Sequence, residues 1–147
     1  MKNQIIQKTI LSVLAVAAIP ALASAATKQY IGTYTVGTTA SSEETYIQFE
    51  ETSADNTVFT SQVKVNSMLA DSGGTGSSCS WCQLDTDIKK KGLLWYSSIG
   101  SKTIKTTTTG TYTGPASSKG GNDTYRFYVT NDNHFSNSGQ VTVTTQS

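Results

Sequence analysis

Residues 124–130 read Thr-Tyr-Arg-Phe-Tyr-Val-Thr, and residues 140–145 read Gln-Val-Thr-Val-Thr-Thr. In both segments neighbouring side chains alternate in character, which is the period of two expected of a β-strand with one face in a core. The segment 131–139 separates them. We therefore expect these two strands to form an antiparallel hairpin.

The same alternation recurs nearer the N-terminus, in residues 30–36, 45–50 and 57–69. We expect these consecutive segments to pair as hairpins, because turn-forming residues lie between them. Tyr30, Tyr34 and Val36 share one face of the first segment, and Ile47 and Phe49 share one face of the second. In the third segment Phe59, Val63 and Val65 are predicted to face inward.

Leu93-Leu-Trp-Tyr96 is the most hydrophobic stretch after the N-terminal region, and glycines lie near both of its ends. A short apolar run bounded in this way is typical of a fully buried strand, so it is predicted to be a central strand. Residues 102–112 are rich in threonine and weakly apolar. Lys102 and Lys105 would discourage pairing with another sheet, which favours an edge strand there.

Seven or eight short strands, with turn signals about every ten residues, predict an all-β fold. Threonine, tyrosine and valine suit half-buried strands, and helical periodicity is hard to find beyond the first residues. We expect a single small antiparallel β-sandwich, either immunoglobulin-like or jelly-roll-like.

The N-terminus has the features of a secretory signal peptide. Lys2 and Lys8 precede an apolar run at 10–19, and Ala23-Ser-Ala25 ends the segment with small side chains. The run is shorter than the ~20 residues that a transmembrane helix needs. We therefore predict a signal peptide at 1–25 and a secreted or cell-surface domain at 26–147, with no transmembrane segment in the domain.

Removal of the signal peptide would leave nine basic and ten acidic side chains, a net charge near −1. Such a charge gives no counterion-release affinity for a phosphate backbone, so nucleic acid is not expected as a partner. Acidic residues predominate in 26–72 and basic residues in 73–147. This asymmetry would favour self-association or attraction to an anionic envelope, or it reflects charges scattered over a compact surface.

Cys79-Ser-Trp-Cys82 contains the two cysteines of the chain. Because an exported chain meets an oxidising environment, we expect a local disulfide between Cys79 and Cys82 that shapes a loop and presents Trp81. A redox dithiol and a zinc site are the alternatives. The first lacks a helix to lower the thiol pKa, and the second lacks four Cys or His ligands.

The remaining titratable side chains form no recognised catalytic or metal-binding pattern. His134 lies in a predicted loop without a nucleophile motif, and acidic pairs beside strand ends are ordinarily solvated. Asp85-Thr-Asp87 is followed by three lysines, which would repel calcium. We assign no catalytic residue, metal or cofactor. The side chains considered were His134, Glu43, Glu44, Glu50, Glu51, Asp85 and Asp87.

An Ala-rich signal peptide end, followed by a Thr-rich domain that closes on 125–130 and 140–143, resembles small secreted β-sandwich proteins of Gram-positive bacteria. Some of these are bacteriocin-like, and many have no assigned function. Our leading hypothesis is a non-enzymatic protein that acts through its surface, by binding the cell envelope, another protein or itself. The alternative is a bacteriocin-like toxin, and an extracellular hydrolase is least expected. Candidate binding residues are Trp81, Trp95 and Tyr96.

Overall fold

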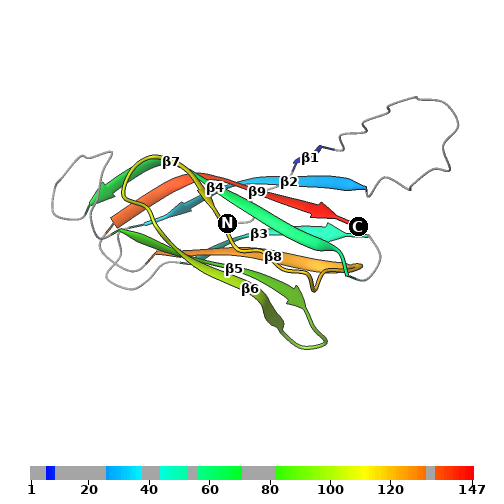
Figure 1. The fold of residues 1–147 in the computed structure, drawn as a ribbon. Coiled ribbons are helices and arrows are strands. Elements are labelled where there is room, and N and C mark those ends of the chain that lie inside the picture. The colour runs from blue at the N-terminus through cyan, green and yellow to red at the C-terminus, as the bar shows by residue number, and fades with distance from the viewer. Residues whose placement is uncertain (1–5, 9–25, 38–43, 53–55, 71–81, 132–134) are drawn as a thin grey trace, which may run out of the picture.

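The computed structural model describes residues 6–8, 26–37, 44–52, 56–70, 82–131 and 135–147, which form two β-sheets packed face to face (Figure 1). No helix occurs in these residues, so the expected all-β sandwich is confirmed. The strands are β1 (Ile6–Lys8), β2 (Thr27–Val36), β3 (Glu44–Glu51), β4 (Val58–Ala70), β5 (Gln83–Lys91), β6 (Tyr96–Lys105), β7 (Gly110–Thr113), β8 (Asp123–Asn131) and β9 (Phe135–Gln146).

The first sheet has the order β2-β9-β4-β7, with the three residues of β1 added outside β2, and the second has the order β3-β8-β5-β6. All pairings are antiparallel. Strand β1 falls within the predicted signal peptide, most of which lies outside the described residues. The signal peptide therefore stays a prediction.

The pairings are nested around one turn. Strand β5 pairs with β6, β4 with β7, β3 with β8, and β2 with β9. The chain from β2 to β9 thus behaves as one long hairpin whose apex lies between β5 and β6. Rolling this hairpin brings β9 against β4 and β8 against β5, which completes the two sheets.

The predicted hairpin of residues 124–130 with 140–145 is wrong. The first segment belongs to β8 and the second to β9, and the two strands lie in opposite sheets. The predicted pairing of 30–36 with 45–50 fails in the same way, because β2 and β3 also lie in different sheets. Alternation tells which face of a strand is buried, but not which strand lies beside it.

Leu93–Tyr96 is not a central strand. Residues 93–95 form the turn between β5 and β6, and Tyr96 begins β6. The interior position between β8 and β6 is taken instead by β5, which the sequence analysis missed. Its inward side chains, Leu84 and Ile88, are buried, but charged residues on its outer face mask the apolar alternation.

The predicted strand 102–112 contains a break. Its first part belongs to β6 and its last part to β7, which lie in different sheets. Both β6 and β7 are edge strands, so the expectation of an edge is confirmed for each of them.

The core fills the space between the two sheets. Phe59, Val63 and Val65, which were predicted to face inward, are buried, and so are the faces that carry Tyr30, Tyr34 and Val36 in β2 and Ile47 and Phe49 in β3. Four aromatic rings gather at one end of the core, where Phe49 stacks on Tyr30 at 4.7 Å and on Tyr125 at 5.5 Å between ring centroids. Phe59 meets the Tyr125 ring edge-on at 4.8 Å. This cluster draws residues from both sheets and fixes their spacing.

Candidate functional site

The turn at the apex of the long hairpin is closed by its own backbone. The Gly92 amide donates a hydrogen bond to the Trp95 carbonyl oxygen at 2.7 Å. A Cβ atom at Gly92 would lie 2.8 Å from that same oxygen, which is too close for any larger residue without a shift. Glycine therefore permits the tight closure, and the three residues after it are presented on the outside of the turn.

Those three residues, Leu93, Leu94 and Trp95, are here named the apolar tip. Their side chains are exposed to 98%, 76% and 73% respectively. Within the described residues, the other large apolar side chains classed as exposed are Val58 and Leu69, which are less than half exposed. Consecutive exposed apolar side chains of this size indicate an interaction surface rather than a folding element.

The apolar tip projects beyond the sheet that carries it. Strand β8 pairs with β5 only as far as Lys90, and the β5–β6 turn bends away from the other strands at the bottom of Figure 1. Lys91 is exposed at the base of the tip, while Lys90 lies 3.9 Å from the Asp123 carboxylate. The tip is therefore an exposed apolar end with lysines behind it, and Leu93 also lines a hollow beside Glu50 and Asp123.

Tyrosines and cations share the outer face of the second sheet, next to the tip. Arg126 of β8 lies between two rings, with its Cζ atom 4.1 Å from the Tyr46 centroid and 4.0 Å from the Tyr96 centroid. Lys89 of β5 places its Nζ atom 4.0 Å from the Tyr128 centroid. These cation–π contacts hold two positive charges beside the apolar tip.

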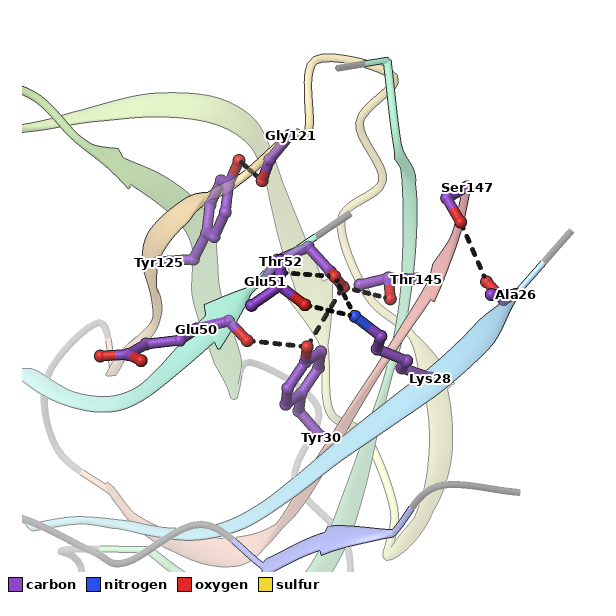
Figure 2. A network of polar contacts seen from close by, with 10 residues as sticks. All are labelled: Ala26, Lys28, Tyr30, Glu50, Glu51, Thr52, Gly121, Tyr125, Thr145 and Ser147. Carbon is purple, nitrogen blue, oxygen red and sulfur yellow. Dashed lines mark hydrogen bonds and ion pairs between the residues drawn. The ribbon is translucent and has the colours of Figure 1, made fainter. Parts of the chain in front are cut away.

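A buried polar network lies between the sheets at the end of β3 (Figure 2). The Glu51 side chain is fully buried, and Lys28 donates to its Oε1 atom at 2.7 Å. The Thr145 hydroxyl donates to Oε2 at 2.6 Å, the Tyr30 hydroxyl lies 3.1 Å from Oε2, and the Thr52 amide donates to Oε1 at 2.8 Å. The single Tyr30 hydroxyl proton is shared with the Glu50 carbonyl oxygen at 2.8 Å, so Oε1 has two donors and Oε2 has Thr145 and a share of Tyr30.

This network ties the two sheets together, since Glu51 comes from the second sheet whereas Lys28, Tyr30 and Thr145 come from the first. Burial, followed by the nearby Glu51 charge, raises the pKa of the Tyr30 hydroxyl, which stays protonated and hydrogen-bonded. A carboxylate with this many donors is held in its charged form. The arrangement stabilises the sandwich, and Glu50 and Glu51 do not converge as a hydrolase pair because Glu50 is exposed.

The structure places the predicted binding residues at different depths. Trp95 belongs to the exposed tip, and Tyr96 is half-buried on the outer sheet face against Arg126. Neither side chain belongs to the core, because the turn between β5 and β6 leaves both outside it. Trp81 lies outside the described residues, so its role stays a prediction.

Cys82 is buried and is not a free thiol in the structure. Its carbonyl oxygen accepts a hydrogen bond from the Thr106 amide at 2.9 Å. Cys79 lies outside the described residues, and the Cys79–Cys82 bridge therefore stays a prediction.

The other titratable candidates do not gather into a site. Asp87 accepts a hydrogen bond from the Ser98 hydroxyl at 2.6 Å, and Asp85 accepts one from the Thr103 hydroxyl. In the part of the chain that the structure describes, no group of three or more His, Cys, Asp or Glu side chains could hold a metal ion. His134 and Glu43 lie outside the described residues.

Sequence reasoning missed Leu93, Leu94 and Arg126 as candidate functional residues. The two leucines belong to an apolar run, residues 93–96, whose composition predicts a buried strand. Two lysines and a glycine directly before them, at 90–92, are the signal that indicates an exposed turn instead. Arg126 is the single arginine of the chain, but its aromatic partners come from distant strands and leave no local pattern.

No family model matches the chain, and neither the curated proteins nor the solved structures contain a significant match to it. In a search restricted to the described residues, no helix is long and apolar enough to cross a bilayer.

Proposed function

We propose that this chain is an exported, non-enzymatic β-sandwich protein that binds the lipid surface of a cell envelope through its apolar tip. The observation that carries the proposal is the exposure of Leu93, Leu94 and Trp95, between 73% and 98%. Removing each such side chain from water contributes about 1.5–3 kcal/mol. A partner that covers the tip therefore gains most of the available free energy from these three residues.

A bilayer suits the tip better than a protein pocket or a small ligand does. The tip lies at the hairpin turn between β5 and β6 (Figure 1), and its three side chains are exposed to solvent rather than gathered around an enclosed cavity. Tryptophan favours the membrane–water interface, and leucine favours the hydrocarbon beneath it. Lys91, exposed at the base of the tip, would add about 1 kcal/mol beside anionic headgroups.

The predicted export of the domain agrees with this role. A signal peptide at 1–25 would deliver the domain 26–147 to the outside of the cell, where an envelope surface is accessible.

The topology supports a jelly-roll assignment, because the first strand of the domain, β2, pairs with the last, β9, and the pairings inside it are nested. An immunoglobulin-like sandwich would instead pair its first two strands.

Vesicle co-sedimentation of the purified protein tests the proposal. We expect the wild-type protein to sediment with phospholipid vesicles and the double variant Leu93→Ser/Leu94→Ser to remain in the supernatant. The matched control is Leu69→Ser, which removes a half-exposed leucine from β4, outside the tip. Equal sedimentation of all three proteins, or no sedimentation of the wild type, would contradict membrane binding by the tip.

A bacteriocin-like toxin would use the same tip differently. A strand that spans a bilayer needs about 9–11 residues, whereas the tip offers three, and β5 behind it is paired on both sides. We therefore expect bound protein to leave vesicles intact, as measured by retention of an encapsulated dye. Dye release that is lost in Leu93→Ser/Leu94→Ser would favour the toxin.

A further inference from the structure

Two positive charges lie directly opposite each other on the outer face of the second sheet. Lys89 of β5 and Arg126 of β8 are cross-strand partners, and like charges in this position destabilise a sheet. Among the described residues, ion pairs join Lys28 to Glu51 and Lys90 to Asp123, and none involves Lys89 or Arg126. The pair, named here the basic pair, keeps both of its charges available to a ligand.

Aromatic rings fix the basic pair without neutralising it. The Arg126 guanidinium lies between Tyr46 and Tyr96, and the Lys89 ammonium lies over Tyr128, each with its charge centre about 4 Å from the ring centroids. A cation over an aromatic face is attracted by the ring quadrupole while its charge persists. The two charges are thus held in place before any ligand arrives.

The guanidinium of Arg126 also retains hydrogen-bonding capacity. Its Nε donates to Gln48 Oε1, and one terminal nitrogen donates to the Tyr128 hydroxyl, both at 3.2 Å. A guanidinium has five N–H donors, so these two bonds leave part of its planar fork for a further acceptor. Phosphate oxygens match that fork in geometry and charge.

Four carboxylates lie on the same face as the basic pair, and three of them, Glu44, Asp85 and Asp87, line a hollow together with Lys89 and Tyr128. Asp87 precedes Lys89 by two residues, pairs across the sheet with Tyr128, and accepts the hydrogen bond from Ser98. Glu50 lies on β3, one row nearer the tip, opposite Thr124. None of the four forms an ion pair with Lys89 or Arg126 within the described residues, so the two cations are not neutralised by direct contact.

We propose that Lys89 and Arg126 bind the phosphodiester headgroup of an anionic lipid, while the apolar tip enters the bilayer beside it. This site deepens the proposed membrane binding and rests on it. Ser98, the other cross-strand partner of Lys89, is three residues from Trp95, which places the basic pair roughly 10 Å from the tip at about 3.3 Å per residue. Interfacial segments insert about 5–10 Å, so the headgroups would lie at the height of the basic pair.

Vesicle binding with and without phosphatidylglycerol tests the basic pair. The wild-type protein is expected to prefer vesicles that contain this anionic lipid over vesicles of phosphatidylcholine alone. Each basic side chain at an anionic surface strengthens binding by about fivefold, so Lys89→Gln/Arg126→Gln should weaken binding to the anionic vesicles by about thirtyfold. Binding to phosphatidylcholine alone should change little.

The control is Lys64→Gln/Lys105→Gln, which removes the same charge from exposed positions away from the tip and the basic pair. We expect it to keep most of the preference, and Lys89→Arg to keep all of it. Equal losses in the two double variants would show that net charge alone attracts the protein, which would overturn the site. If Leu93→Ser/Leu94→Ser still bound vesicles as the wild type does, the tip proposal would fail, whereas an unchanged preference in Lys89→Gln/Arg126→Gln would defeat only the headgroup site.

Two further measurements separate a folding defect and a different phosphate source from the proposal. Inorganic phosphate should raise the thermal unfolding temperature of the wild type but not of Lys89→Gln/Arg126→Gln, and an equal rise in both would contradict the site without any membrane present. Soluble poly(glycerol phosphate) offers the same phosphodiester without a bilayer. If it bound as tightly as the vesicles, and the tip substitutions had no effect, the partner would be a polymer and the lipid assignment would be wrong.

Discussion

Glu50 and Glu51 are neighbours in the sequence, yet Glu50 is exposed and Glu51 is 1% exposed. The alternation of β3 explains this difference, because Glu51 lies on the buried face that Ile47 and Phe49 share. The sequence alone does not show what surrounds a carboxylate placed there. Thr145, which donates to it, lies 94 residues further along the chain, and only the closure of the sandwich brings the two side chains together.

The hydrogen bond from Thr145 to Glu51 can be tested by substitution. Thr145→Val keeps the shape of the side chain and removes the donor from a buried charge, which should lower the free energy of unfolding by about 1.5–3 kcal/mol. Thr144→Val is the control, since the adjacent side chain points to the other face of β9. Urea unfolding measures both variants, and equal losses would show that the network contributes no specific stabilisation.

Two buried tyrosines predict a loss of stability at alkaline pH. Burial raises the pKa of Tyr30 and of Tyr34 above the ordinary value of 10.0, and the charges of Glu51 and Tyr112 respectively add to this effect. The folded protein therefore holds both protons at a pH where the unfolded chain releases them. This stabilisation is fully present below about pH 10 and is lost as the pH rises further.

The free energy of unfolding of the wild type should accordingly fall above about pH 10. Tyr34→Phe removes one of the two groups, so its free energy of unfolding should fall less steeply over the same range. Urea unfolding at a series of pH values gives both curves. Parallel curves would contradict the assignment of the alkaline loss to Tyr34.

At the scale of the element, the β5–β6 hairpin shows that an apolar run can be either a buried strand or an exposed turn. Leu93–Tyr96 has the composition of a buried strand, and the sequence predicts one there. The run instead falls at the apex of nested pairings, beyond the last residue of β5 that β8 contacts as a partner, Lys90. No opposite sheet can cover side chains at that position. Composition shows that these side chains are apolar, but it does not predict whether they are buried in the core of this chain or at an interface with a partner.

Leucine substitutions in the exposed tip and in the buried part of β5 should therefore have different effects on the free energy of unfolding. Leu93→Ser/Leu94→Ser should change the free energy of unfolding by no more than about 0.5 kcal/mol, because both side chains are exposed. Leu84→Ala, in the fully buried part of β5, should cost about 2–5 kcal/mol. Thermal or urea unfolding makes the comparison. A large loss in the tip variant would mean that the tip packs against the domain.

Strand β9 shows a second limit of local patterns. The sequence predicts that residues 131–139 connect two strands and that Gly139 ends this connection, whereas the structure places Phe135 to Gly139 in β9. In the structure Gly139 lies within β9, opposite Tyr34 and Val65. A Cβ atom there would lie 1.8 Å from the Lys64 carbonyl oxygen. The glycine permits close approach of two strands rather than a turn, and this requirement depends on a partner that is distant in sequence.

For the whole molecule, the sequence predicts the class of fold and the inward faces of its strands well. It does so because burial imposes a period of two on each strand separately. The sequence does not predict which strands are neighbours, since β2 pairs with β9 across most of the chain length. The candidate site follows from that topology. The nested pairings place one turn at the apex, and the tyrosines and cations on β3, β5, β6 and β8 meet beside it only after the chain has rolled up.

Membrane insertion of the apolar tip is the central claim, and the fluorescence of Trp95 tests it most directly. Trp81→Phe leaves Trp95 as the single tryptophan of the chain. On addition of anionic vesicles, its emission is expected to shift to shorter wavelength, and lipids brominated near the headgroup should quench it more strongly than lipids brominated at the chain ends. Emission that neither shifts nor is quenched by either lipid would contradict insertion of the tip.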